Sequence, residues 1–323
     1  AEVILKNNLL EGKLVVSIEQ AVAAPYCSVK LADAGARVIK VERKEGDFAR
    51  YYDNFVKGDS TYFVWLNRGK ESLIADIKNS KDQKLLKKII LKSDIFIQNL
   101  LPGTLEKYGL DSKFLRKKNK KLITCDISGY GSDGANSKTK AYDLLIQAET
   151  GLCSLTGDES NPGRVGISVC DIACGLNAYT LILEALLERE QTGVGASIKI
   201  SLFDSLSEWM NVPYLQYVYT KQAPERVGLA HPSIVPYGCF ISKDNTNILF
   251  SIQNEREWVS FEENILKLPE KLKKKFINPS QRLKYKIKLN KLIAKAFKLL
   301  TSKKITYYFK KGNIAYGFLN NIK

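Results

Sequence analysis

The sequence predicts an α/β fold in which a large domain, built on a doubly wound parallel sheet, is accompanied by a smaller α/β domain. Two observations indicate this. Short apolar runs alternate with segments of helical spacing over about the first 200 residues, and this alternation ends near residue 202. The chain has 323 residues, 45% of them apolar, which is enough to bury a large core.

The first three elements form a βαβ unit. An apolar run at 14–18 is typical of a buried strand, residues 25–34 have helical spacing and end at Gly35, and a second apolar run follows at 37–41. The same alternation continues downstream. We expect a helix at 82–91, a strand at 95–97, a further helix, and a strand at 122–127. Strands joined through helices lie parallel, so these elements predict a Rossmann-like sheet.

A long helix is predicted over 176–190, stopped by turn glycines before a strand at 196–200. Beyond it the pattern favours connecting helix to about residue 227, then a hairpin of strands 237–241 and 247–252. We therefore assign residues 1–201 to the large domain, 202–227 to a linker and 228–323 to the small α/β domain.

The formal charge of +16 raises the question of nucleic-acid binding. Much of the excess is lysine after about residue 265, alternating with apolar residues as on the solvated faces of helices. Clustered arginines with stacking aromatics are lacking, so we expect no nucleic-acid partner. No run of about 18 uninterrupted apolar residues and no signal peptide is evident, so we expect a cytoplasmic protein without a membrane partner.

The six cysteines are scattered along the chain. The closest pair, Cys170 and Cys174, has no histidines or further cysteines at zinc-site spacing. We expect free thiols and no metal. The only methionine is Met210, so the sequence as given does not begin at an initiator residue.

In dinucleotide-binding proteins, the turn after the first strand carries a glycine-rich fingerprint. Residues 19–25 contain no glycine, so the dinucleotide fingerprint is absent. Arg43 follows the second strand, where a guanidinium can stack on a base or pair with a phosphate. A surface arginine with neither role explains the sequence equally well.

The candidate chemistry is that of a carboxylate. The single histidine, His231, excludes a histidine pair, and no serine lies in a nucleophile-elbow sequence. Asp171 stands in a stretch of small and apolar residues just before the long helix. From the residues alone it is either the cap of that helix or a nucleophile.

Five short motifs, in order along nearly the whole chain, carry a resemblance to a known family. They are 67–73 (NRGKESL), 99–103 (NLLPG), 128–131 (SGYG), 142–148 (YDLLIQA) and 231–238 (HPSIVPYG). The chain resembles the family III coenzyme A-transferases, the formyl-CoA and carnitine-CoA transferase family. The resemblance implies an acyl-CoA and a small carboxylic acid as substrates, no tightly bound cofactor, and a homodimer of interlocked rings.

The resemblance also implies roles for individual residues. Asp171 falls at the family's catalytic aspartate, which attacks the thioester to form a mixed anhydride and then an aspartyl-CoA thioester. Lys107 stands where an arginine is common, which keeps the charge but loses the bidentate fork. The residues that the resemblance places at CoA are Val22, Ala23, Arg43, Leu73, Asn99, Lys107, Lys140 and Tyr142.

Tyr142 bears on an alternative activity. The α-methylacyl-CoA racemases resemble this sequence but have a histidine at that position, and a phenol is a poor base at neutral pH.

Residues 228–238 resemble the branch that acts on small dicarboxylates such as succinate, malate or mesaconate. Members of the family are usually longer, with a C-terminal segment that returns to the large domain, and that segment is expected to be missing here. A racemase-like enzyme and a truncated CoA-binding protein without turnover remain the alternatives.

Overall fold

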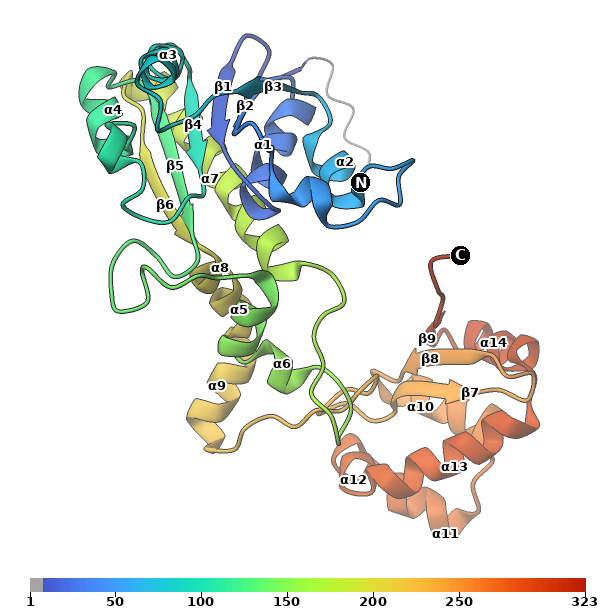
Figure 1. The fold of residues 1–323 in the computed structure, drawn as a ribbon. Coiled ribbons are helices and arrows are strands. Elements are labelled where there is room, and N and C mark those ends of the chain that lie inside the picture. The colour runs from blue at the N-terminus through green and yellow to red at the C-terminus, as the bar shows by residue number, and fades with distance from the viewer. Residues whose placement is uncertain (1–7) are drawn as a thin grey trace. The chain divides into compact units, whose positions relative to one another are not determined.

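The computed structural model describes residues 8–323 and contains a six-stranded sheet in the order β3-β2-β1-β4-β5-β6 (Figure 1). Every neighbouring pair of these strands is parallel, which confirms the predicted doubly wound sheet. The strands are β1 Leu14–Ile18, β2 Arg37–Glu42, β3 Lys70–Ile74, β4 Ile95–Gln98, β5 Ile123–Ser128 and β6 Ser197–Ser201.

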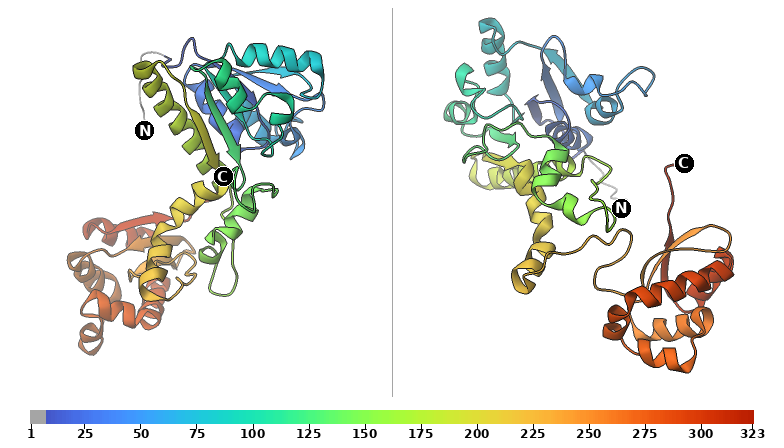
Figure 2. Two further views of the ribbon diagram at one scale, coloured as in Figure 1. Left: turned by 90° about the vertical axis from the view of Figure 1, so that its left-hand side faces the viewer. Right: turned by 60° about the horizontal axis from the view of Figure 1, so that its bottom comes forward.

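Helices cover both faces of this sheet (Figures 1 and 2). On one face, α1 (Ala23–Asp33) and α7 (Val169–Thr192) pack over Val15 and its neighbours. On the other face, α3 (Ser80–Ile90) and α4 (Ser112–Lys118) pack over Val16 and its neighbours. Successive side chains of a strand point to opposite faces of the sheet, and helices cover both faces. The sequences of the central strands are therefore continuously apolar.

The remaining helices before the small unit are short and connect these layers. They are η1 Phe48–Tyr51, α2 Thr61–Asn67, η2 Glu106–Tyr108, α5 Asp143–Glu149, α6 Leu152–Leu155, α8 Leu202–Ser207, η3 Glu208–Met210 and α9 Asn211–Thr220.

Helix α7 begins at Val169, seven residues before the predicted start, and ends at Gly193, whose φ of 70° suits glycine. Asp171 therefore lies in the first turn of α7 and not ahead of it. By length and composition α7 is apolar enough to cross a membrane. Its residues Cys174, Ala178 and Ile182 are fully buried in the core beneath the sheet, as in the core helix of a globular domain.

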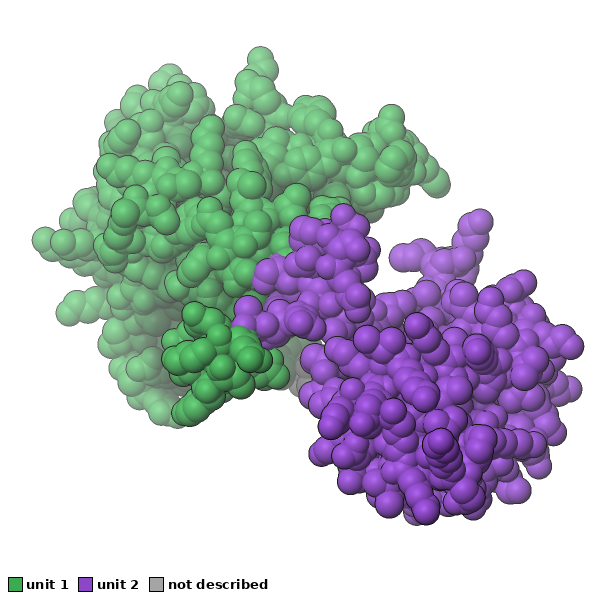
Figure 3. All heavy atoms as spheres, turned by 90° about the horizontal axis from the view of Figure 1, so that it is seen from below, with its two compact units in different colours: residues 1–153, 164–222 green, residues 154–163, 223–323 purple. Residues whose placement is uncertain are grey.

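The chain divides into two compact units (Figure 3). The larger comprises residues 1–153 and 164–222, and the smaller comprises residues 154–163 and 223–323. The segment 154–163 thus groups with the C-terminal part of the chain although it interrupts the larger unit in sequence. The expected domain limits at residues 201 and 228 stay predictions.

The smaller unit holds an antiparallel sheet in the order β7-β8-β9 and a core of packed aromatic rings. The predicted hairpin is present, and a third strand joins it. Phe250 lies at the centre, with ring centroids 4.9 Å from both Phe261 and Phe309. The elements of this unit are β7 Tyr237–Ile241, β8 Asn247–Ser251, α10 Glu255–Phe261, η4 Glu262–Leu266, α11 Glu270–Lys273, η5 Lys274–Phe276, α12 Pro279–Lys284, α13 Lys286–Leu299, α14 Ser302–Lys311 and β9 Ala315–Phe318.

Candidate active site

The order of the sheet reverses between β1 and β4, and a cavity of about 590 Å³ opens there, at the carboxyl ends of the strands. Parallel α/β sheets bind their ligands at such a switch point. Residues at the carboxyl ends of three strands line the cavity: 20–23 after β1, 99–102 after β4, and 127–129 at the end of β5. All of its lining residues belong to the larger unit.

Asp171 lines this cavity from the first turn of α7. Its carboxylate makes no hydrogen bond or ion pair with the side chains and backbone that the structure describes. Burial, and then the nearby negative charge of Asp143, raise the pKa of Asp171 to about 7. A carboxyl group that is desolvated, unpartnered and open to a cavity is a candidate for chemistry.

Asp143, the first residue of α5, caps helix α7. Its Oδ1 accepts the backbone N–H of Cys170 at 2.8 Å and that of Asp171 at 3.2 Å, and its Oδ2 accepts from Nε2 of Gln147 at 2.6 Å. The capping role that the sequence left open for Asp171 is therefore filled by Asp143, which leaves the Asp171 carboxylate free to face the cavity.

The structure brings five of the predicted CoA-contacting residues to the same cavity as Asp171. They are Val22, Ala23, Asn99, Lys140 and Tyr142. The Asn99 side chain is engaged within the protein, because its Oδ1 accepts the N–H of Gln20 at 2.9 Å and its Nδ2 donates to the Gln20 carbonyl at 2.8 Å. Asn99 thus positions the turn after β1.

Arg43 lines a neighbouring cavity of about 700 Å³, and its Nε donates to the Gly46 carbonyl at 3.1 Å. Gln20 and Leu100 line both cavities. The two other predicted contacts lie apart from them. Leu73 packs against the core on the α3 face, and Lys107 is exposed on η2; neither lines a cavity described here.

Several residues of the cavity carried no signal in the sequence. Arg164 stands in a loop of the larger unit and is exposed. The rings of Phe48, Tyr52 and Tyr62 form an aromatic row, with centroids 5.8 Å apart for Phe48 and Tyr52 and 5.4 Å apart for Tyr52 and Tyr62. These residues come from a loop and two short helices, none of which has a motif.

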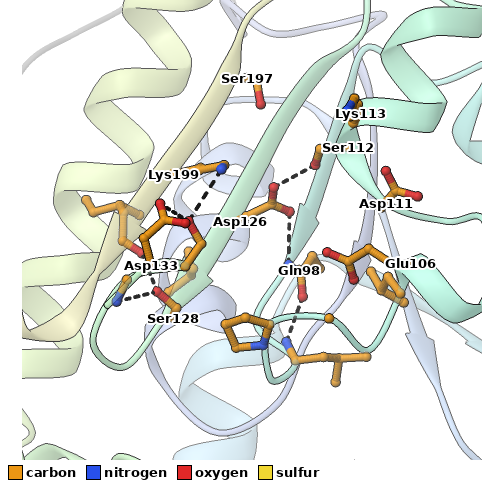
Figure 4. Close-up of a pocket in the computed structure, with 18 of the residues that line it drawn as sticks. Gln98, Glu106, Asp111, Ser112, Lys113, Asp126, Ser128, Asp133, Ser197 and Lys199 are labelled. Carbon is orange, nitrogen blue, oxygen red and sulfur yellow. Dashed lines mark hydrogen bonds between the residues drawn. The ribbon is translucent and has the colours of Figure 1, made fainter. Parts of the chain in front are cut away.

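A larger cavity, of about 1120 Å³, lies over the polar part of the sheet face formed by β5 and β6 (Figure 4). Asp126 occupies its floor, accepting from Gln98 Nε2 at 2.9 Å and from Ser112 Oγ at 2.7 Å. Burial raises the pKa of Asp126. Asp171 does not line this cavity.

His231 has a structural role in the smaller unit. Its Nδ1 accepts the backbone N–H groups of Ser233 at 3.2 Å and Ile234 at 3.1 Å, and its ring stacks on Tyr237. Over residues 8–323, no group of three or more His, Cys, Asp or Glu side chains is arranged to hold a metal ion.

The sequence matches the model of CoA-transferase family III over residues 10–323. It is 33% identical to succinyl-CoA:glutarate CoA-transferase of Homo sapiens, over 98% of this chain and 73% of that protein. It is 34% identical to acetyl-CoA:oxalate CoA-transferase of Acetobacter aceti, over 74% of this chain and 62% of that protein. A crystal structure of a CAIB/BAIF family protein from Brucella suis is similar with a TM-score of 0.85 and 31% identity, covering 97% of this chain and 84% of that one.

These findings, together with the doubly wound sheet and the carboxylate at its switch point, define an enzyme that handles acyl-CoA thioesters. The chain belongs to CoA-transferase family III. The predicted family and the predicted class of enzyme, a CoA-transferase, are confirmed.

Proposed function

We propose that this protein transfers CoA from an acyl-CoA thioester to a small dicarboxylic acid, with Asp171 as the nucleophile. The observation that carries the proposal is the unpartnered Asp171 carboxylate on the wall of the switch-point cavity. The names of relatives support the substrate class: besides the glutarate and oxalate enzymes, the chain is 33% identical over 245 residues to succinyl-CoA:mesaconate CoA-transferase of Haloarcula hispanica.

The proposed reaction begins when a carboxylate oxygen of Asp171 attacks the thioester carbonyl carbon. The carbon–sulfur bond breaks, CoA leaves as a thiolate, and an acyl-aspartyl anhydride remains. The thiolate then attacks the Asp171 carbonyl carbon and releases the first acid as a carboxylate, leaving an aspartyl-CoA thioester. The acceptor acid reverses these two steps with its own carboxylate. Attack requires ionised Asp171, so a pKa raised to about 7 makes the competent fraction of the free enzyme depend on pH near neutrality.

Two cations, Lys140 and Arg164, line the cavity among the described residues. A dicarboxylate presents one carboxylate to the reaction and a second that needs a partner, and a guanidinium can pair with it through two hydrogen bonds. The loop that carries Arg164 is anchored at the next residue, because the N–H of Val165 donates to Oε1 of the buried Gln147 at 2.9 Å. We assign the second carboxylate of the acceptor to Arg164.

For the coenzyme, we propose that the nucleotide lies in the Arg43 cavity and that the pantetheine arm passes Gln20 and Leu100 toward Asp171. The support is that these two residues line both cavities. The contacts expected from Leu73 and Lys107, the interlocked homodimer and the cytoplasmic location also remain proposals. A racemase is disfavoured because a tyrosine, Tyr142, stands at the cavity where racemases have a histidine.

The test is exchange of CoA between succinyl-CoA and a panel of mono- and dicarboxylic acids, followed by trapping with hydroxylamine. We expect exchange with dicarboxylates, a hydroxamate at Asp171, and loss of turnover with retained CoA binding in Asp171→Ala. CoA binding without exchange for any acid would favour the CoA-binding alternative. Loss of configuration at the α-carbon of a branched acyl-CoA would favour the racemase.

A further inference from the structure

A group of four ionised side chains lies directly beneath the turn of residues 20–23, which lines the cavity of Asp171. We call Glu19, Lys40, Asp47 and Lys70 the charge cluster. Their side chains are at most 2% exposed, and their two positive and two negative charges cancel. Glu19 directly follows β1, Lys40 lies within β2, Lys70 begins β3, and Asp47 stands in the loop after β2.

The cluster is closely connected. Nζ of Lys40 lies 2.7 Å from Oδ2 of Asp47 and 3.8 Å from Oε1 of Glu19, and Nζ of Lys70 lies 2.8 Å from the same Glu19 oxygen. Both lysines also donate to Oδ1 of Asn67, at 2.9 and 3.3 Å. Burying four charges costs stability that an apolar core of similar volume would not lose, so such a cluster adds little to folding and is better suited to fixing a geometry.

The geometry that it fixes is the turn above it. Oδ1 of Asp47 accepts the N–H of Ala21 at 3.1 Å and that of Ala49 at 2.9 Å, while Oδ2 is held by Lys40. Ala21 has a φ of 63°, a left-handed conformation that costs energy for any residue with a Cβ and needs the surroundings to hold it. On the other side of the turn, Asn99 binds both the N–H and the carbonyl of Gln20.

We propose that the charge cluster holds this turn in its strained conformation, and that Asp47 is a positioning residue for the reaction at Asp171. Asp47 lines the Arg43 cavity and not that of Asp171, which Ala21, Val22 and Ala23 line. The catalytic part of the proposal rests on the proposed function. The structural part, that Asp47 restrains the Ala21 backbone, does not.

The variant Asp47→Asn tests the proposal. Oδ1 of Asp47 faces the N–H groups of Ala21 and Ala49 and Oδ2 faces the Lys40 ammonium, so the NH₂ group of an amide must meet hydrogen-bond donors on one of the two sides. A matched control exists in Asp94, whose Oδ2 accepts the N–H of Leu14 at 2.9 Å and whose Oδ1 pairs with Arg189 at 2.9 Å, at the amino ends of β1 and β4. Asp94→Asn therefore makes the same change away from the cavity.

We expect Asp47→Asn to lower kcat by about 10- to 100-fold, because small displacements of a reacting geometry act on the chemical step. Asp94→Asn should leave kcat within about twofold. Adding Ala21→Gly to Asp47→Asn should recover at least about threefold in kcat, because glycine adopts a positive φ without being held there. Equal kcat in the two Asn variants, or no recovery when Ala21→Gly is added, would overturn the catalytic role.

Amide hydrogen exchange tests the restraint without any activity measurement. In the wild-type chain the N–H of Ala21 should exchange at least about 100-fold more slowly than an unprotected amide. Asp47→Ala leaves no acceptor for this N–H and should remove that protection, while Asp94→Ala should not. Unprotected exchange at Ala21 in the wild type overturns the proposal even if Asp47→Ala fails to fold. Protection that depends on Asp47, in a protein that exchanges no CoA with any acid, would refute the proposed function and leave the restraint standing.

Discussion

Gly175 in α7 lies so close to α1 that a Cβ added to it would come within 2.5 Å of the Ala23 carbonyl oxygen. Gly175 is one helical turn beyond Asp171, and Ala23 is the first residue of α1 and lines the cavity. The two helices can cross at this distance only because residue 175 has no side chain. This contact brings the turn after β1 to Asp171, the proposed nucleophile.

Gly175→Ala is therefore expected to destabilise the protein by about 1–3 kcal/mol, as overpacking does in a core, and to lower kcat by moving Ala23 away from Asp171. Denaturant unfolding and the exchange assay measure the two effects. Gly166→Ala is the control, since nothing lies within 4 Å of the added methyl group there and its stability should change by no more than about 1 kcal/mol. Equal stability of the two variants would contradict the close crossing.

The rate of exchange should depend on the ionisation of Asp171. With a pKa of about 7, kcat/KM for acyl-CoA is expected to fall about tenfold per pH unit below about pH 6 and to level off above pH 8. Asp143→Asn removes the neighbouring negative charge and should shift the midpoint to lower pH. Asp111→Asn, which alters a cap on α4 instead, should leave the midpoint in place. A midpoint near 4 in the wild type would show that burial does not act on Asp171 as described.

The same pKa predicts how stability varies with pH. The folded protein keeps a proton on Asp171 that the unfolded chain, with a pKa of about 3.9, releases. This contribution to stability is fully present below about pH 4 and is lost as the pH rises through about 7. Asp171→Asn cannot ionise, so its stability relative to the wild type should rise by about 1–2 kcal/mol between pH 5 and pH 8, allowing for partial exposure of the carboxylate. A constant difference across that range would count against the assignment.

Arg164→Gln tests the choice of acceptor. Loss of the guanidinium should raise KM for dicarboxylate acceptors by about 10- to 100-fold, because the second carboxylate loses a charged partner worth about 1.5–3 kcal/mol, and should change KM for monocarboxylates little. Arg256→Gln, at an exposed arginine of the smaller unit, is the control. An equal rise in KM for both classes of acid would assign Arg164 to the coenzyme or to the fold.

The central strands were predictable because of where they lie. β1 occupies residues 14–18, the predicted range, since a strand covered on both faces is apolar throughout. β3 was not predicted, because this edge strand, Lys70–Ile74, is polar and largely exposed. β9 is also an exposed edge strand. An apolar run therefore predicts a strand only where the strand is buried, and exposed edge strands are not predicted in this way.

Six of the nine site residues that the resemblance implies line one cavity. They are Asp171, Val22, Ala23, Asn99, Lys140 and Tyr142, and their roles stay predictions. The start of α7 was placed too late because its cap, Asp143, is 27 residues distant in sequence from the N–H that it binds at Cys170. Asp47 and Arg164, for which roles are proposed, stand in loops that lie near the cavity only in the folded chain, and no local pattern marks such residues.

Alkylation of the buried thiols in the larger unit can be used to measure separation of α1 from α7. Cys27 lies in α1, and Cys170 and Cys174 lie in α7, all buried beneath the same sheet face. Burial raises the pKa of each of these thiols above its ordinary range, so in the folded protein they are neither ionised nor open to an alkylating reagent. Their alkylation must therefore wait for the two helices to separate, and its rate in the native protein measures how often this wall of the Asp171 cavity opens.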